Sequence, residues 1–191
     1  MNFLAHLYLS GSNPKLMVGN FIGDFVKGRT MVQQFEPEII KGIELHRAID
    51  AFTDTHPVVT QSKNRLRPMY RHYAPVIVDV FYDYYLARNW HLYHTVELSA
   101  FAVQAYTTLQ FHHAILPERV QQMLPYMING NWLVNYARVE GIQRALTGMS
   151  RRTTYISKMD EAINELRKYH DEFEEEFLTF FPQLIDHANN F

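Results

Sequence analysis

The sequence contains no cysteine, and this absence removes several kinds of chemistry. A thiolate nucleophile, a disulfide framework and a zinc site built on sulfur are all excluded. Any metal ion must therefore be held by histidine, aspartate and glutamate side chains. A chain without cysteine is compatible with a reducing compartment, and we expect a soluble, cytoplasmic protein.

Neither sign of charge is in marked excess. The 18 Lys and Arg residues and 20 Asp and Glu residues give a formal net charge of -2. A protein that binds nucleic acid normally carries a clear basic excess, so we expect no nucleic-acid partner. The apolar stretch at 2–9 is too short to span a bilayer and is interrupted by His6, so we expect no membrane partner either.

The glycine signatures of common catalytic loops are missing as well. The chain has no Gly-x-Ser-x-Gly motif, no Walker motif and no dinucleotide-binding glycine pattern. A serine nucleophile of the α/β-hydrolase kind, a phosphate loop and a nicotinamide cofactor are therefore not expected.

Apolar residues recur mainly with the spacing of a helix. No convincing run alternates apolar and polar residues as a strand would. The sequence predicts an all-α fold in which 1–191 form a single compact multi-helix domain. Prolines at 37, 57, 75 and 117 are typical of first helical turns. The predicted helices are 3–9, 15–27, 37–52, 57–69, 74–89, 97–113, 117–128, 132–147 and 156–179.

Three polar interruptions in apolar segments indicate a site: 19–24, His46–Asp50 and 79–83. A charge inside a protein is normally paired, hydrogen-bonded or bound to a metal, because burying it alone is costly. His46 and Asp50 are four residues apart, which places both side chains on one helix face within reach of a single ion. The alternative is that Asp50 pairs with Arg47 and that His46 is satisfied in the core.

Asp79 and Asp83 repeat this spacing in an apolar and aromatic segment. Two carboxylates at that spacing repel each other, so they need a metal ion, an arginine or a proton. Arginines at 47, 71 and 88 are the alternative to a metal. For Asp24, the alternative to a ligand role is an ion pair with Lys27 at the surface. For His6, the alternative is an ordinary core histidine.

Several motifs occur in an order that resembles the acyl carrier protein phosphodiesterases. They lie at 2–7, 19–28, 42–50, 53–57, 74–83, 131–134 and 148–152. The resemblance covers nearly the whole chain, and a set of spaced motifs in one order is far more specific than any one of them.

This resemblance implies an all-α hydrolase, distantly similar to HD-type metal phosphohydrolases, although no His-Asp dipeptide stands at the place expected for them. The implied reaction removes 4′-phosphopantetheine from holo-acyl carrier protein and leaves apo-acyl carrier protein, which connects the chain to fatty acid and lipid metabolism. The implied cofactor is a divalent metal, with Mn²⁺ first and Mg²⁺ or Fe²⁺ as alternatives.

On this basis we expect His46, Asp50, Asp24 and Asp79 to bind the metal, with His6 and Asp83 as additional ligands or as residues that hold the ligands in place. Arg47 and Lys27 would hold phosphate oxygens, because negative charge develops there during phosphodiester hydrolysis.

Two basic groups are candidates for docking the acidic carrier protein, since complementary charge raises association rates. They are Arg65, Arg67 and Arg71 with His72, and Arg151 and Arg152 with Lys158. Ordinary solvated surface is the alternative for each group.

Two other functions stay open: a metal-dependent phosphohydrolase of a nucleotide or other small phosphoester, and a non-enzymatic helical interaction module.

Overall fold

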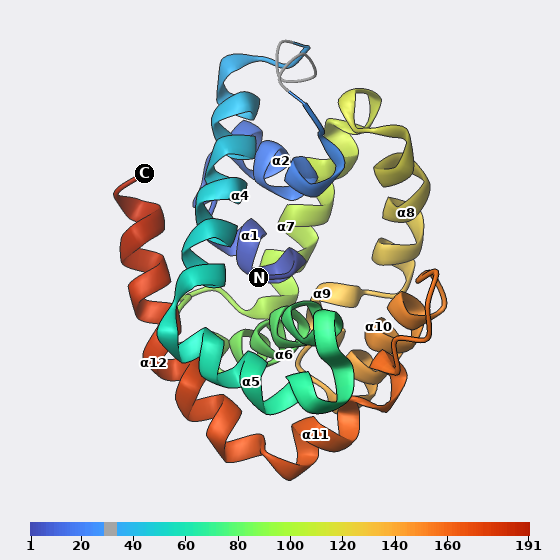
Figure 1. Cartoon of the computed structure of the whole chain (residues 1–191). Coiled ribbons are helices and arrows are strands. Elements are labelled where there is room, and N and C mark those ends of the chain that lie inside the picture. The colour runs from blue at the N-terminus through green and yellow to red at the C-terminus, as the bar shows by residue number, and fades with distance from the viewer. Residues whose placement is uncertain (29–33) are drawn as a thin grey trace.

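The computed structural model describes residues 1–28 and 34–191 (Figure 1). These residues form α-helices, short 3-10 helices and connecting loops without any strand, so the all-α prediction is confirmed. The elements are α1 (Phe3–Tyr8), α2 (Pro14–Ile22), η1 (Gly23–Phe25), α4 (Pro37–Thr55), α5 (Pro57–Tyr70), η2 (Arg71–Tyr73), α6 (Ala74–Arg88), η3 (Trp90–Leu92), α7 (Leu98–Phe111), η4 (His113–Ile115), α8 (Glu118–Asn129), α9 (Trp132–Asn135), α10 (Val139–Ser150), η5 (Met159–Glu161), α11 (Ile163–Lys168) and α12 (His170–Asn189).

Proline and asparagine fix several of the helix starts. Pro37 and Pro57 occupy the first positions of α4 and α5, and Pro75 lies in the first turn of α6. Asn13 caps α2, where its side chain accepts hydrogen bonds from two backbone N–H groups. Proline suits these positions because an N–H in the first turn has no partner within the helix.

Three predicted helices are wrong in extent. The helix predicted at 15–27 ends as α2 at Ile22 and continues only as the 3-10 turn η1. The helix predicted at 132–147 is divided into α9 and α10. The segment predicted as one helix at 156–179 becomes η5, α11 and α12, because Tyr169 adopts φ -116° and ψ 36° and interrupts the helix.

Helix α6 lies near the centre of the molecule and is surrounded by other helices (Figure 1). Nearly all of its residues from Ile77 to Ala87 are buried, and it contacts α1, α5, α10 and α12. One hydrophobic cluster extends from Leu4 in α1 to Leu184 in α12, as expected for one folding unit. In the described parts of the chain, every helix is too short or too polar to cross a membrane.

A pair of glycines brings α2 and α4 into close contact. A Cβ on Gly19 would lie 2.0 Å from the carbonyl oxygen of Ile39, and one on Gly42 would lie 2.3 Å from that of Leu16. No side chain fits in either place, so the two backbones touch directly. This contact brings the backbone of Asn20 within reach of α4.

Candidate metal centre

The side chains of His6, His46 and Asp50 meet at one point between α1 and α4. One ligand atom from each residue lies within 4.8 Å of the others. The Asp50 carboxylate places Oδ1 3.3 Å from His6 Nε2 and Oδ2 3.1 Å from His46 Nε2. The two imidazole rings stack with their centroids 3.9 Å apart. The predicted His46 and Asp50 pair therefore faces one point, and His6 joins it.

Asn20 orients both imidazole rings. Its amide nitrogen donates to the backbone oxygen of His6 at 2.8 Å and to Ser10 Oγ at 3.0 Å, which leaves Oδ1 to accept from His6 Nδ1 at 2.8 Å. The backbone oxygen of Asn20 accepts from His46 Nδ1 at 2.7 Å. Because both Nδ1 atoms act as donors, each Nε2 atom is directed at Asp50. Metal-binding histidines are commonly oriented in this way through their other ring nitrogen.

Asn20 was not among the residues predicted to form the site. The signal in the sequence is an amide side chain within the apolar segment of α2. The structure shows this side chain to be fully buried, where it needs a defined hydrogen-bond partner.

Both Nε2 atoms are buried and have no hydrogen bond of acceptable geometry among the described residues. Burial lowers the pKa of His6, so this imidazole is neutral and its Nε2 lone pair faces the Asp50 carboxylate. Two acceptors 3.3 Å apart repel each other unless a cation lies between them.

The charge on His46 responds to two carboxylates. Burial alone would lower its pKa, but Asp24 and Asp50 together raise the pKa of His46 to about 9. Burial opposes ionisation of Asp50, yet His46 and the Met1 amino group hold the pKa of its carboxyl well below the usual range. The cluster therefore attracts positive charge.

Asp24 approaches the cluster from the solvent side. Its Oδ1 lies 3.2 Å from His46 Nε2, and its side chain is 74% exposed. The contact with His46 lowers the pKa of Asp24, so the carboxylate is ionised. A Cβ on Gly23 would lie 2.3 Å from His46 Cγ, so a glycine is needed for η1 to lie against the ring. The site is thus closed on the histidine side and open at Asp24.

Asp79 and Asp83 have other partners. Asp79 Oδ1 lies 3.0 Å from the Met1 amino group, which is 3.7 Å from Asp50 Oδ1. Asp83 is fully buried and accepts hydrogen bonds from the backbone N–H groups of Leu4 at 2.7 Å and Ala5 at 3.2 Å. Burial raises the pKa of Asp83 to about 7. Both Asp83 oxygens therefore hold the first turn of α1 in place of the expected coordination.

The predicted phosphate-binding residues, Arg47 and Lys27, are both exposed. Arg47 follows His46 in α4 and donates to the backbone oxygen of Val26 at 3.4 Å. The alternative pairs, Asp50 with Arg47 and Asp24 with Lys27, do not occur among the described ion pairs.

The donor set fits a divalent metal. Imidazole nitrogens combined with carboxylate oxygens suit Mn²⁺, Fe²⁺ or Zn²⁺. Two donors at right angles around an ion at ~2.1 Å are roughly 3 Å apart. The observed separations of 3.1 to 3.3 Å between the histidine nitrogens and carboxylate oxygens are of this size.

The predicted docking arginines differ in their surroundings. Arg65 donates to both carboxylate oxygens of Glu176 at 2.7 Å, and its side chain is only 17% exposed. The guanidinium of Arg65 is therefore used within the protein. The remaining four, Arg67, Arg71, Arg151 and Arg152, are exposed.

Comparisons with known proteins agree over nearly the whole chain. The sequence model of the family described as Acyl carrier protein phosphodiesterase matches residues 1–184. A protein of that name from Photorhabdus laumondii is 34% identical over 191 residues, which cover 100% of this chain and 96% of the relative. Another from Yersinia enterocolitica is 32% identical, with coverage of 100% and 98%. No solved structure matches the chain.

Proposed function

Because this chain belongs to the acyl carrier protein phosphodiesterase family, we propose that it hydrolyses the phosphodiester that joins 4′-phosphopantetheine to holo-acyl carrier protein. The match over residues 1–184 and the full-length similarity to proteins of that name support this assignment. The products are apo-acyl carrier protein and 4′-phosphopantetheine, and the reaction takes place in the cytoplasm as part of lipid metabolism.

The observation that carries the proposal is the buried lone pair of His6 Nε2 facing the Asp50 carboxylate at 3.3 Å. This arrangement calls for a cation, and we assign a divalent metal, Mn²⁺ first, to His6, His46 and Asp50 with Asp24 on the open side. When bound, such an ion polarises phosphoryl oxygens and makes water a stronger nucleophile at neutral pH.

The residues on the open side supply proton transfer and charge. Asp24 has one oxygen turned to His46, so its second oxygen is available to accept a proton from the attacking water. Arg47, which contacts the backbone oxygen of Val26 just after Asp24, and the exposed Lys27 are assigned to balance the charge on the phosphate oxygens. The bond from the water oxygen to phosphorus forms, the bond from phosphorus to the carrier's serine oxygen breaks, and that oxygen takes up a proton.

The exposed arginines Arg67, Arg71, Arg151 and Arg152 provide the positive surface for the acidic carrier protein. Charge complementarity of this kind increases the rate at which two proteins meet. Arg65 is left out of this surface because Glu176 already binds its guanidinium.

The test is incubation of the purified protein with holo-acyl carrier protein and Mn²⁺, followed by mass spectrometry of the carrier. We expect loss of the phosphopantetheine arm. His46→Ala should lose bound metal and lower turnover by at least roughly 100-fold, because it removes a ligand from a closed cluster. Asp24→Ala should also lower turnover, and His91→Ala, at an exposed histidine, is the matched control.

Full activity of a folded His46→Ala variant would contradict the metal assignment. Turnover of a nucleotide panel without any release of the arm from holo-carrier protein would instead favour the small-phosphoester hypothesis.

A further inference from the structure

The α-amino group of Met1 is buried beside the candidate metal centre. Only 7% of the Met1 surface is exposed, although an amino terminus is usually solvated and poorly ordered. The amino nitrogen is 3.0 Å from Asp79 Oδ1 and 3.7 Å from Asp50 Oδ1. His6 Nε2 faces the same Asp50 oxygen at 3.3 Å. The amino group and the metal centre therefore share one carboxylate.

The charge of this amino group has the partners that burial requires. Burial opposes the charge, but Asp79, Asp50 and Asp83 together raise the pKa of the amino group, so it is a cation at neutral pH. A buried charge is costly unless it is paired. The spacing of Asp79 and Asp83 on α6 predicts that this pair needs a cation or a proton, and the amino group is the cation that Asp79 binds.

The second aspartate of the pair holds the backbone that follows. Asp83 accepts hydrogen bonds from the N–H groups of Leu4 at 2.7 Å and Ala5 at 3.2 Å. His6 is the next residue of α1. The ion pair of the Met1 amino group fixes the chain just ahead of this turn. The position of the His6 ring therefore depends on how the start of α1 is held.

The surroundings of Met1 leave little space for a larger group on its nitrogen. The Met1 side chain has no exposed surface and belongs to the hydrophobic core. An acyl group or an added residue must displace either the nitrogen from its carboxylates or the side chain from the core, because protein interiors are closely packed. Acylation also removes the positive charge and leaves one N–H where the amino group has three.

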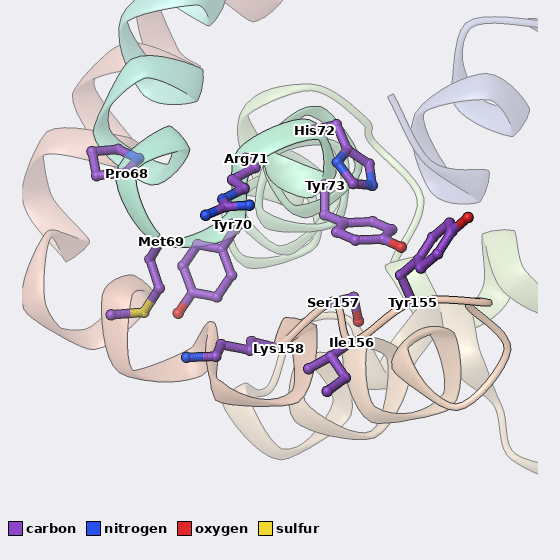
Figure 2. A pocket seen from close by; sticks show the side chains of 10 residues that line it. All are labelled: Pro68, Met69, Tyr70, Arg71, His72, Tyr73, Tyr155, Ile156, Ser157 and Lys158. Carbon is purple, nitrogen blue, oxygen red and sulfur yellow. The ribbon is translucent and has the colours of Figure 1, made fainter.

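The amino group lies outside the hollow that opens where α5 ends. This hollow has a volume of about 830 Å³, and residues 68–73 and 155–158 line it, including the basic side chains of Arg71, His72 and Lys158 (Figure 2). Neither Met1 nor Asp79 is one of its lining residues. The contacts of the amino group are instead with carboxylates at the metal centre.

We propose that a free α-amino group at Met1 is a required part of the metal centre, where it holds Asp50 and the start of α1 in position. Asp79 is then a positioning residue, because it acts on the centre through this amino group. Acetylation of the nitrogen, or a residue added before it, prevents the metal ligands from meeting. The role of the amino group rests on the proposed function, since the ligands that it positions are those assigned there to the metal.

The experiment titrates metal-free protein with Mn²⁺ and follows binding by electron paramagnetic resonance. It compares the protein with a free amino group at Met1, the protein acetylated there, and the protein with one glycine added before Met1. We expect roughly 10- to 100-fold weaker binding by the acetylated and extended forms, as for the loss of other outer partners of metal ligands. One glycine added after Phe191 is the matched control, because Phe191 is 46% exposed and lies at the outer end of α12 (Figure 1).

Intact mass identifies each form, and thermal melting checks its fold. The titrations are done well below the melting temperature of every form, where a purely structural contact leaves Mn²⁺ affinity unchanged.

Asp79→Asn separates positioning from direct coordination. If Asp79 acts through the amino group, a glycine before Met1 should cause little further loss of Mn²⁺ affinity in this variant, because both changes break the same contact. Losses that multiply would mean that Asp79 acts on the ion by itself, and they would overturn its assignment as a positioning residue.

Equal Mn²⁺ affinities of the acetylated and free forms would overturn the proposal. Tighter binding by the acetylated form would overturn it too, since the amino group would then only compete with the metal for Asp50. Binding of Mn²⁺ that acetylation weakens, without release of the arm from holo-carrier protein, would support the role of the amino group while the proposed function fails.

Discussion

At the scale of single residues, Asn20 fixes the direction of both imidazole rings that face Asp50. Its side-chain oxygen accepts from His6 Nδ1, and its backbone oxygen accepts from His46 Nδ1. Asn20→Ala removes the first of these contacts and leaves His6 free to rotate. We expect Mn²⁺ affinity to fall by roughly 10- to 100-fold, as for other outer partners of metal-binding histidines.

Titration of the metal-free protein with Mn²⁺, followed by electron paramagnetic resonance, measures this loss. Ser10→Ala is the control, since it removes one partner of the Asn20 amide and leaves both contacts to the histidines. Equal Mn²⁺ affinities of Asn20→Ala and the wild type would show that Asn20 does not position the ring.

The protonation state of Asp83 affects the stability of the fold. Burial raises its folded-state pKa to about 7, above the unfolded value. The unfolded state therefore loses its proton first as pH rises. The protonated Asp83 side chain therefore makes its full contribution to the free energy of unfolding below about pH 4. This contribution falls by up to ~4 kcal/mol as the pH rises to 7.

Asp83→Asn removes this titration and turns one amide N–H toward a backbone donor of α1. We expect it to be less stable than the wild type by about 1–3 kcal/mol at low pH. The difference should shrink as pH rises to 7. Urea unfolding of both proteins from pH 4 to 8 measures the trend, and a constant difference would contradict it. Asp186→Asn, at an exposed aspartate of α12, is the control.

The spacing of His46 and Asp50 could be predicted from the sequence because it depends only on helix geometry. The part played by Asp83 could not. Its partners are the backbone N–H groups of Leu4 and Ala5, far away in the chain, and such groups leave no signal in the side-chain pattern. Aspartate in an apolar segment indicated a buried partner without revealing which one.

At the scale of elements, the direct contact between α2 and α4 sets the position of the site. Gly19→Ala would place a Cβ 2.0 Å from the Ile39 carbonyl oxygen, so the two helices must move apart. We expect a loss of at least about 1–3 kcal/mol in the free energy of unfolding, which is typical of overpacking. Metal affinity should fall in parallel, because α2 carries Asn20.

Gly148→Ala is the matched control for this substitution. Gly148 lies inside α10, and apart from the adjacent backbone of its own helix no described atom is within 4 Å of the place that an alanine methyl group would occupy. Alanine there should stabilise the protein by up to about 1 kcal/mol through helix propensity. Denaturant unfolding compares the two variants, and similar effects of both would show that the glycine contact is not required.

The helix starts at proline were predictable because the ring fixes φ locally. The interruptions were not. Between α9 and α10, a Cβ on Gly141 would lie 1.9 Å from the Asn135 carbonyl oxygen, so the chain turns tightly there and α10 packs directly against the end of α9. Lys158 adopts a left-handed conformation without any glycine or proline signal. The helical period continues across both places, which is why the sequence predicted longer helices.

At the scale of the whole molecule, α12 closes the core through a buried ion pair. Glu176 is 6% exposed and receives Arg65 from α5, while Ser62 also donates to it. A carboxylate buried to this extent is strongly destabilising when its partner is removed. Arg65 therefore belongs to the fold, and the exposed arginines are the ones that we propose for docking of an acidic partner.

The net charge of -2 means that any attraction to an acidic carrier protein is local. Arg152→Glu reverses an exposed charge just after α10, whereas Arg119→Glu makes the same change on α8. We expect Arg152→Glu to raise KM for holo-carrier protein by roughly 3- to 10-fold, because steering by local charge is lost. The dependence of kcat/KM on salt should become weaker, since screening acts on the charges that remain. Steady-state kinetics from low to high NaCl separates the two variants, and an equal response of Arg119→Glu would mean that only the total charge of the protein matters.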